Sequence, residues 1–276
     1  MSLQNKAMLV TLSVSCWTAR KQDKKVSAEV EASHNARDAG RYNKLLIDKQ
    51  HLDPLTSYAG QIRAYHYKMT MPWMDNGARL LPAKLFNEYS KEMRRMKQEY
   101  ANLVSKLVAA YPGLVQEARQ RLGTMYEPSD YPDASELYGK FDVETDITEV
   151  PSGSDFRVDI GDAERESIRA EIAERVAKRQ RAAIDSAWVR VREAVNRVVV
   201  CLSAPKARIF DSLTENLEDL TRILPGLNIN DDPDMDRVCE RIVNGLIVDP
   251  DRLRKSATLR DRVRVEAESI LQLCPT

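Results

Sequence analysis

The chain contains few of the residues on which small disulfide-rich or metal-binding folds depend. Its four cysteines are spread over 276 residues and show no C-x-x-C spacing. This distribution argues against a disulfide framework and against a zinc site. We therefore expect buried free thiols, no bound metal and no cofactor.

Catalytic signatures are also scarce. The chain has three histidines, His34, His51 and His66, and none has a recognisable partner for general acid–base catalysis. A glycine-rich phosphate loop, a G-x-S-x-G turn and an H-E-x-x-H pair are all missing from the sequence. A nuclease would need carboxylates that converge on a metal ion, and no spacing indicates them. We expect a protein that is not an enzyme, although 42 acidic residues allow accidental carboxylate pairs.

Long apolar runs are absent as well. No segment approaches the ~20 apolar residues that a membrane-spanning helix needs. Thr11, Ser13 and Ser15 interrupt the apolar stretch near the N-terminus, which argues against a secretory signal. The composition, 43% hydrophobic and 30% charged, is typical of soluble globular proteins. We expect a cytoplasmic protein that does not contact membranes.

The charge is balanced over the whole chain but unevenly distributed. Residues 1–110 contain 18 Lys and Arg against 10 Asp and Glu, whereas residues 111–162 contain 4 against 12. Residues 163–276 contain 20 of each sign. A basic segment can attract a phosphate backbone even when the net charge is zero. Alternatively, the basic and acidic segments face each other in the fold.

Two stretches have the two-residue alternation of β-strands. Apolar residues alternate with Thr11, Ser13 and Ser15 from Met8 to Cys16, which predicts one strand. A second alternation covers residues 141–147 and 156–160 with PSGS between them, which predicts a β-hairpin. The acidic segment 127–162 contains this hairpin. Its charge either suppresses strand pairing, contacts a basic partner such as a polymerase, or limits DNA binding.

Helical signals dominate the rest of the chain. The pairs Asp53-Pro54, Asp232-Pro233 and Asp249-Pro250 each predict a helix start. Apolar residues recur every three or four positions between Pro82 and Pro112, which predicts a long amphipathic helix. About forty residues without a helix breaker follow Asp162, and such length favours a bundle or an oligomer. The remainder predicts two or three shorter helices.

Together these signals predict an α+β fold that is mainly α, in which long helices form a bundle. A small antiparallel β element would combine the N-terminal strand with the hairpin near residues 141–160. We distinguish a basic segment 1–122, an acidic loop and hairpin 123–161, and a helical segment 162–276, all within one bipartite domain.

Two stretches combine basic and aromatic residues. The segment WTARKQDKKVSAEV has the densest basic cluster, formed by Arg20, Lys21, Lys24 and Lys25 beside Trp17. The segment RAYHYKMTMPWMDNGARLLP adds Arg63, Tyr65, Tyr67, Lys68, Trp73 and Arg79. Arg and Lys neutralise phosphate, and exposed aromatic rings stack on bases at ~1 to 3 kcal/mol per base. The alternative is a helix end whose aromatic rings pack in the core, with ordinary solvated charges around it.

These segments also carry a resemblance. WTARKQDKKVSAEVEASHNARDAGRYNK and RAYHYKMTMPWMDNGARLLPAKLFNEYSKEMR resemble a family of uncharacterised proteins encoded by tailed phages. The resemblance to this family extends from about residue 8 to residue 110, and within the family the chain resembles the single-stranded-DNA-binding RNA polymerase cofactors of podoviruses. The resemblance implies a protein that holds melted promoters open in the host cytoplasm and recruits the phage RNA polymerase. The usual barrel of single-strand binders is not expected, because the chain is largely helical.

Our leading hypothesis is therefore a non-enzymatic phage protein, expected to form homo-oligomers, that binds single-stranded DNA with little sequence preference. Its candidate DNA contacts are ten residues of the two basic and aromatic segments: Arg20, Lys21, Lys24, Lys25, Arg63, Tyr65, Tyr67, Lys68, Trp73 and Arg79. Trp17 is not among them. The alternative is a non-enzymatic protein-interaction adaptor for a phage ATPase system, whose long helices would be docking surfaces.

Overall fold

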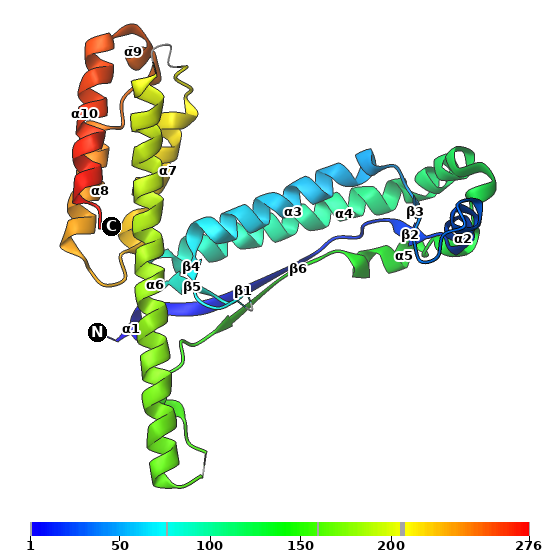
Figure 1. The fold of residues 1–276 in the computed structure, drawn as a ribbon, viewed down its shortest axis with the longest axis horizontal. Helices are drawn as coiled ribbons and strands as arrows, with labels where there is room; N and C mark the ends of the chain where they lie inside the picture. Colours follow the sequence, from blue (N-terminus) through cyan, green and yellow to red (C-terminus); the bar gives the residue numbers. More distant parts are fainter. Residues whose placement is uncertain (1, 76, 159, 205–207, 276) are drawn as a thin grey trace. The chain divides into compact units, whose positions relative to one another are not determined.

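The computed structural model describes residues 2–75, 77–158, 160–204 and 208–275 (Figure 1). The chain divides into two compact units, neither of which is continuous in sequence. Unit 1 comprises Met1–Thr11, Tyr67–Tyr89 and Asp146–Thr276, and unit 2 comprises Leu12–His66 and Ser90–Thr145. Most of the described residues are helical, and a small antiparallel sheet accompanies the long helices, which confirms the predicted fold class.

The main sheet has four strands in the order β4-β5-β1-β6. Their bounds are Ala7–Ser15 for β1, Met71–Pro72 for β4, Arg79–Pro82 for β5 and Asp142–Thr148 for β6. Strand β5 pairs antiparallel with both β1 and β4, and Met8 of β1 lies opposite Leu81. The predicted N-terminal strand is therefore confirmed. The sequence did not predict β4 and β5, which are short and contain proline.

The predicted hairpin is correct only in its first strand. Of the predicted first strand, residues 142–147 lie in β6, but residues 156–158 and 160 are not in a strand, and Asp159 lies outside the described residues. A 3-10 turn, η5 (Gly153–Asp155), packs against the helix α6 (Asp162–Ser203) instead. A Cβ on Gly153 would lie only 2.7 Å from the carbonyl oxygen of Arg169. Arg169 Nε also donates a hydrogen bond to the Phe156 carbonyl oxygen at 3.3 Å, so this segment packs on helix α6 and does not pair with β6. The neighbour of β6 in the sheet is β1.

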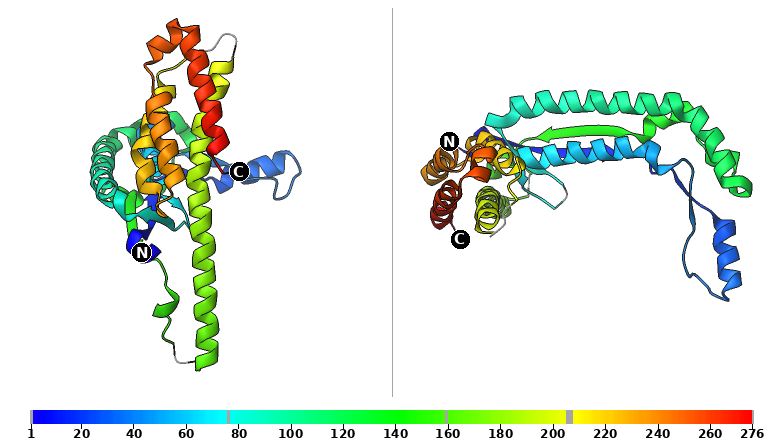
Figure 2. Two further views of the ribbon diagram at one scale, coloured as in Figure 1. Left: turned by 90° about the vertical axis from the view of Figure 1, so that its left-hand side faces the viewer. Right: turned by 90° about the horizontal axis from the view of Figure 1, so that it is seen from above.

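A helical bundle makes up most of unit 1. Helix α6 packs against α7 (Ser212–Leu227) and α10 (Ala257–Leu273), and α8 (Pro233–Gly245) packs against both α7 and α10 (Figures 1 and 2). The short helix α9 (Pro250–Lys255) precedes α10. Four helices thus follow α6 in the described residues, where the sequence predicted two or three. The predicted forty-residue helix is confirmed as α6.

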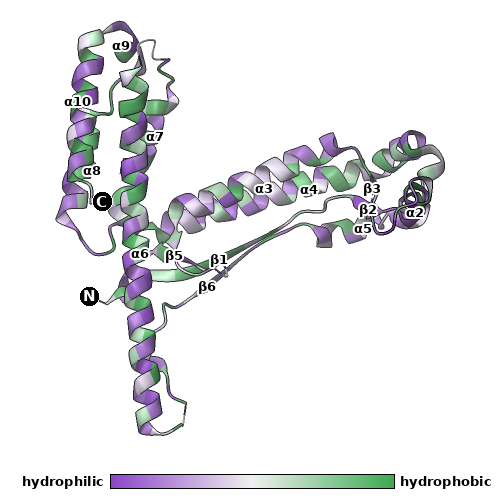
Figure 3. Cartoon of the chain, viewed as in Figure 1, coloured by the Kyte–Doolittle hydropathy of each residue, from purple (hydrophilic) through white to green (hydrophobic). Residues whose placement is uncertain are grey.

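Helix α6 is buried along only part of its length. Its buried residues begin at Ala183 and continue to Leu202, whereas none of the residues from Asp162 to Ala182 is fully buried. Figure 3 shows hydrophobic and hydrophilic residues alternating along both parts. The apolar stripe therefore extends beyond the part of the helix that the bundle covers.

Two of the three Asp-Pro pairs mark the start of a helix, as predicted. Asp232 and Asp249 cap α8 and α9, each accepting a hydrogen bond from the backbone N–H two residues later. The predicted start at Asp53 is wrong, because α3 (Lys49–Met69) begins one turn earlier, where the Asp48 carboxylate accepts a hydrogen bond from Gln50 N. Similarly, α4 (Phe86–Leu122) continues through Pro112. Buried packing of the flanking Tyr111 and Leu114 outweighs the hydrogen bond that proline removes.

Unit 2 combines parts of α3 and α4 with a small lobe near the N-terminus. This lobe contains β2 (Arg20–Gln22), α2 (Lys24–Ser33) and β3 (Asn43–Leu45), and β2 pairs antiparallel with β3. Helix α2 has no buried residue, and Figure 2 shows it apart from α3. The remaining short elements are α1 (Leu3–Lys6), η1 (Ala83–Leu85), η2 (Gly123–Met125), η3 (Pro128–Asp130), α5 (Ala134–Leu137) and η4 (Tyr138–Lys140). No helix in the described part of the chain is long and apolar enough to cross a membrane.

Candidate nucleic-acid interface

Four basic residues of unit 2 lie exposed at the junction of β2 and α2. Arg20 and Lys21 lie on β2, and Lys24 and Lys25 occupy the first turn of α2. None of these four side chains forms a salt bridge with any described residue, whereas Lys44 on the neighbouring strand forms two. We call Arg20, Lys21, Lys24 and Lys25 the basic quartet. Its four side chains are exposed and have no direct ion-pair partner among the described residues.

A buried ion pair fixes the backbone beneath the basic quartet. Lys44 is only 5% exposed, and its Nζ lies 2.6 Å from Asp130 Oδ2 and 3.5 Å from Asp23 Oδ2. Lys44 also donates a hydrogen bond to the Met125 carbonyl oxygen at 2.9 Å. The carboxylate of Asp23 caps α2, because Lys25 N and Val26 N each donate to it at 3.1 Å. The bond from Val26, assisted by Lys44, lowers the pKa of Asp23 and keeps it charged.

A hollow of about 470 Å³ opens beside the basic quartet within unit 2. Arg20 and Lys21 line it together with the half-buried Trp17, whose ring meets that of Tyr111 edge-on at 6.0 Å. The sequence placed Trp17 in the basic cluster but gave it no stacking role. Asp133 and Glu136 line the same hollow. Basic and acidic segments thus face each other here, as the second interpretation of the charge pattern expected.

A second group of predicted residues belongs to unit 1, at the C-terminal end of α3. The Arg79 guanidinium lies over the Tyr67 ring, 4.6 Å from its centroid, and Arg79 Nε donates to Thr70 Oγ1 at 2.7 Å. Burial lowers the pKa of Arg79. Lys68 Nζ forms a salt bridge with Asp219 at 2.7 Å. Both basic groups are therefore engaged within unit 1.

Trp73 is not accessible to a nucleic-acid base. Its side chain is only 5% exposed, and the Arg179 guanidinium lies 5.9 Å from its ring centroid. The predicted stacking role of Trp73 is therefore wrong, because a base needs an open ring face. Tyr67, the neighbouring candidate for stacking, is in contrast 55% exposed.

The remaining predicted contacts lie in unit 2. Arg63 is exposed, and its Nη2 donates a hydrogen bond to the Val14 carbonyl oxygen at 2.9 Å, while Tyr65 is half-buried. The ten predicted residues are thus divided between the units: the basic quartet, Arg63 and Tyr65 in unit 2, and the other four in unit 1.

Sequence reasoning missed one exposed aromatic residue beside the basic quartet. Tyr42 is 43% exposed, and its carbonyl oxygen accepts a hydrogen bond from Asp23 N at 2.9 Å. This bond joins Tyr42 to Asp23, the residue that directly precedes Lys24. The dipeptide Arg41-Tyr42, an aromatic residue next to a basic one, was the available signal.

No cluster of three or more His, Cys, Asp or Glu side chains suited to a metal ion occurs within the described ranges.

Comparison of the chain with protein-family models, with curated proteins and with solved structures gives no match. Function must therefore be inferred from the chemistry of these surfaces.

Proposed function

We propose that the protein binds single-stranded DNA with little sequence preference through the basic quartet and Trp17. The observation that carries this proposal is the exposed basic quartet, without a direct ion-pair partner among the described residues, beside a half-buried tryptophan. Phosphate contacts by Lys and Arg release counterions and require no particular base sequence. A tryptophan at the edge of a hollow adds stacking, which every base can provide. Tyr42 is a second stacking group on the same lobe.

The biological role that we propose follows from the resemblance to phage proteins. The protein would act without catalysis in the host cytoplasm, hold melted promoters as single strands and recruit the phage RNA polymerase. The acidic residues of segment 127–162 would then contact the polymerase. Among them, Asp133 and Glu136 line the hollow beside Trp17, so a polymerase at this surface would lie next to the bound strand.

Fluorescence anisotropy with single-stranded and duplex oligonucleotides of the same sequence tests this proposal. We expect single strands to bind more tightly, and the affinity to fall as salt increases. The double substitution Lys24→Glu and Lys25→Glu should weaken binding and reduce the salt slope by about 0.7 for each phosphate that the protein no longer neutralises. An unchanged slope would remove the basic quartet from the interface.

A matched control separates local contacts from overall charge. Arg94 and Lys106 are exposed residues of α4 in the same unit, and neither forms a salt bridge within the described part of the chain. Replacing both with Glu changes the net charge by the same amount as the test variant. We expect this control to retain most of the affinity and salt dependence. Equal losses in both double variants would mean that binding follows net charge alone.

A second candidate function is a protein-interaction adaptor, favoured by the first half of α6. Its apolar residues Ile168, Ile172 and Val176 remain only half-buried. A partner helix could cover this stripe, either from another protein or from a second copy of the chain. Absence of oligonucleotide binding at low salt would favour the adaptor. Polymerase genes beside the gene would favour the first function, and an ATPase gene the second.

A further inference from the structure

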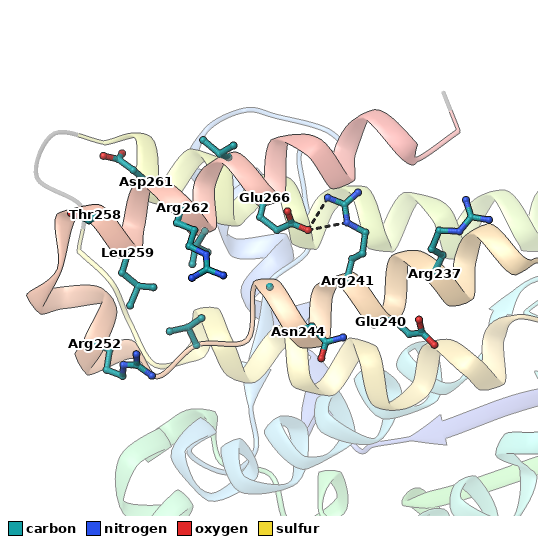
Figure 4. A pocket seen from close by; sticks show the side chains of 14 residues that line it. Arg237, Glu240, Arg241, Asn244, Arg252, Thr258, Leu259, Asp261, Arg262 and Glu266 are labelled. Carbon is teal, nitrogen blue, oxygen red and sulfur yellow. Dashed lines mark hydrogen bonds and ion pairs between the residues drawn. The ribbon is translucent and has the colours of Figure 1, made fainter.

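The helical bundle of unit 1 contains a cavity that the proposed DNA interface does not use. It has a volume of about 920 Å³ and lies among α8, α9 and α10 (Figure 4). Val248, Leu259 and the buried Val263 give it apolar walls, and arginines from all three helices line it. Small-molecule sites commonly have this volume and this combination of apolar walls with a few polar groups.

The arginines of the cavity differ in how they are paired. Arg241 Nη2 lies 2.8 Å from Glu266 Oε1, and Arg241 also donates to Ser269 Oγ at 3.1 Å. Arg237 pairs with Asp234 at 3.1 Å. In contrast, the side chains of Arg252 and Arg262 form no salt bridge or hydrogen bond with any residue that the structure describes. Figure 4 shows Arg252 on α9 at the far side of the cavity from the Arg241–Glu266 pair, and Arg262 on α10 one turn before Glu266.

Arg252 and Arg262 lie between two hollows of different charge. Both residues line an adjoining hollow of about 460 Å³ together with Lys255, Ser256 and Thr258. No carboxylate is among the described residues that line this hollow. Three carboxylates line the larger cavity instead: Glu266 pairs with Arg241 at 2.8 Å, Asp261 lies 3.9 Å from Arg264, and Glu240 has no salt bridge among the described residues. Three cations and two hydroxyl groups therefore share the adjoining hollow, and its described lining contains no carboxylate.

We propose that Arg252 and Arg262 bind the phosphate group of a small phosphorylated molecule, whose apolar or planar remainder lies in the larger cavity. Guanidinium groups match the geometry of phosphate oxygens and form charge-assisted hydrogen bonds with them. Lys255 adds a third positive charge, and the hydroxyl groups of Ser256 and Thr258 supply further donors. The apolar walls near Leu259 and Val263 suit a body of about the size of a nucleoside.

Isothermal titration calorimetry with the full chain tests the proposal, using inorganic phosphate, adenosine and adenosine monophosphate as probes. We expect the monophosphate to bind more tightly than phosphate, because it also buries apolar surface, and adenosine to bind least. Arg252→Gln and Arg262→Gln should each raise the Kd for the monophosphate about tenfold or more, as expected for losing a charge-assisted hydrogen bond. Arg262→Lys should weaken binding less than Arg262→Gln.

Arg197→Gln is the matched control, because Arg197 is an exposed residue of α6 in the same unit. We expect it to bind the monophosphate like the wild type. Failure of every phosphorylated probe to bind, or unchanged binding in Arg252→Gln and Arg262→Gln, would overturn the proposal. A melting temperature equal to that of the wild type shows that a loss of binding is not a loss of folding.

Oligonucleotide binding distinguishes this site from the basic quartet. If the cavity binds a small ligand, Arg252→Gln leaves the anisotropy titration with single-stranded DNA unchanged, and Lys24→Glu with Lys25→Glu leaves the calorimetry unchanged. If single-stranded DNA displaces the monophosphate and Arg252→Gln abolishes both, the arginines contact a polynucleotide. That result would overturn the small-ligand proposal. If instead the basic quartet proves not to bind DNA, the small-ligand proposal is unaffected.

Discussion

Arg190 of α6 donates a hydrogen bond from Nη1 to the carbonyl oxygen of Lys68, at a distance of 2.9 Å. Its Nη2 also donates to the carbonyl oxygens of Tyr67, at 3.1 Å, and Thr70. The last carbonyls of a helix have no partner within the helix and favour a positive charge. The end of α3 is therefore capped by an arginine that follows it by more than a hundred residues.

Replacing Arg190 with Met should destabilise the bundle of unit 1. The partly buried carbonyl oxygens of α3 would lose their donors, and each unsatisfied group costs ~1 to 3 kcal/mol. We expect the free energy of unfolding in urea to fall by about 3 kcal/mol. Arg197→Met on the exposed face of the same helix should change it little. Equal effects of both substitutions would mean that the arginine cap contributes no stability.

Gly226 of α7 should not tolerate even a methyl group. A Cβ at this position would lie 2.4 Å from Leu85 Cδ2 and 2.5 Å from its Cγ, so a simple rotation of the leucine cannot relieve the clash. We expect Gly226→Ala to lower the free energy of unfolding by ~1 to 3 kcal/mol.

Gly113 of α4 provides the opposite case, because a Cβ there meets no atom within 4 Å. Since alanine favours helix more than glycine does, Gly113→Ala should stabilise the protein by up to about 1 kcal/mol. Thermal or urea unfolding of both variants measures the contrast. A stabilised Gly226→Ala variant would contradict the packing between Gly226 and Leu85.

Lys44→Met should remove the ion pair beneath the basic quartet. Although burial opposes the charge, the bonds with Asp130 and Asp23 raise the pKa of Lys44. The variant leaves two carboxylates without their cation, and we expect its free energy of unfolding at neutral pH to be lower than that of the wild type. Exposed Lys106→Met serves as the control.

The effect of Lys44→Met should depend on pH. The pKa of Asp23 is lowered from 3.8, first by the Val26 hydrogen bond and then by Lys44. A carboxyl group with a lowered pKa stabilises the folded state fully above its unfolded pKa, and this stabilisation is lost as the pH falls through the folded pKa. The difference between wild type and variant should therefore be complete at pH 7 and shrink below about pH 3.8. A difference that is constant with pH would contradict the ion pair.

Tryptophan fluorescence should report on the DNA interface. Trp73 and Trp188 are only 5% and 4% exposed, whereas Trp17 is half-buried beside the basic quartet. We expect a single-stranded oligonucleotide to quench the wild type and Trp73→Phe, but not Trp17→Phe. Trp17→Ala should weaken binding about tenfold, because stacking contributes ~1 to 3 kcal/mol per base. Quenching that persists without Trp17 would place the DNA elsewhere.

The sequence correctly predicted the helices whose start or length is set by residues nearby in the chain. The breaker-free segment after Asp162 forms α6, and the Asp-Pro pairs at 232 and 249 begin helices. The pair at 53 failed because Asp48 offered an earlier cap. The second hairpin strand failed because Arg169 holds the Phe156 segment, and no local pattern encodes that contact.

The candidate site shows the same distinction. The basic quartet remains exposed because β2 and α2 are short surface elements that bury none of its side chains. The burial of Trp73 depends on unit 1, where Arg179 covers its ring, and the role of Lys68 depends on Asp219. Arg190 resembles an ordinary solvated charge in the sequence, although it caps a helix. Such partners far along the chain cannot be identified from spacing alone.

The arginine cap also sets an order of events during synthesis. All residues of unit 2 precede Asp146, so the ribosome completes this unit before it makes α6. Because domains tend to fold as they emerge, unit 2 can fold while the carbonyl groups of Tyr67, Lys68 and Thr70 still face water. Arg190 reaches them only after most of α6 has left the ribosome. The end of α3 thus receives its cap only after most of α6 has been synthesised, although it belongs to the first third of the chain.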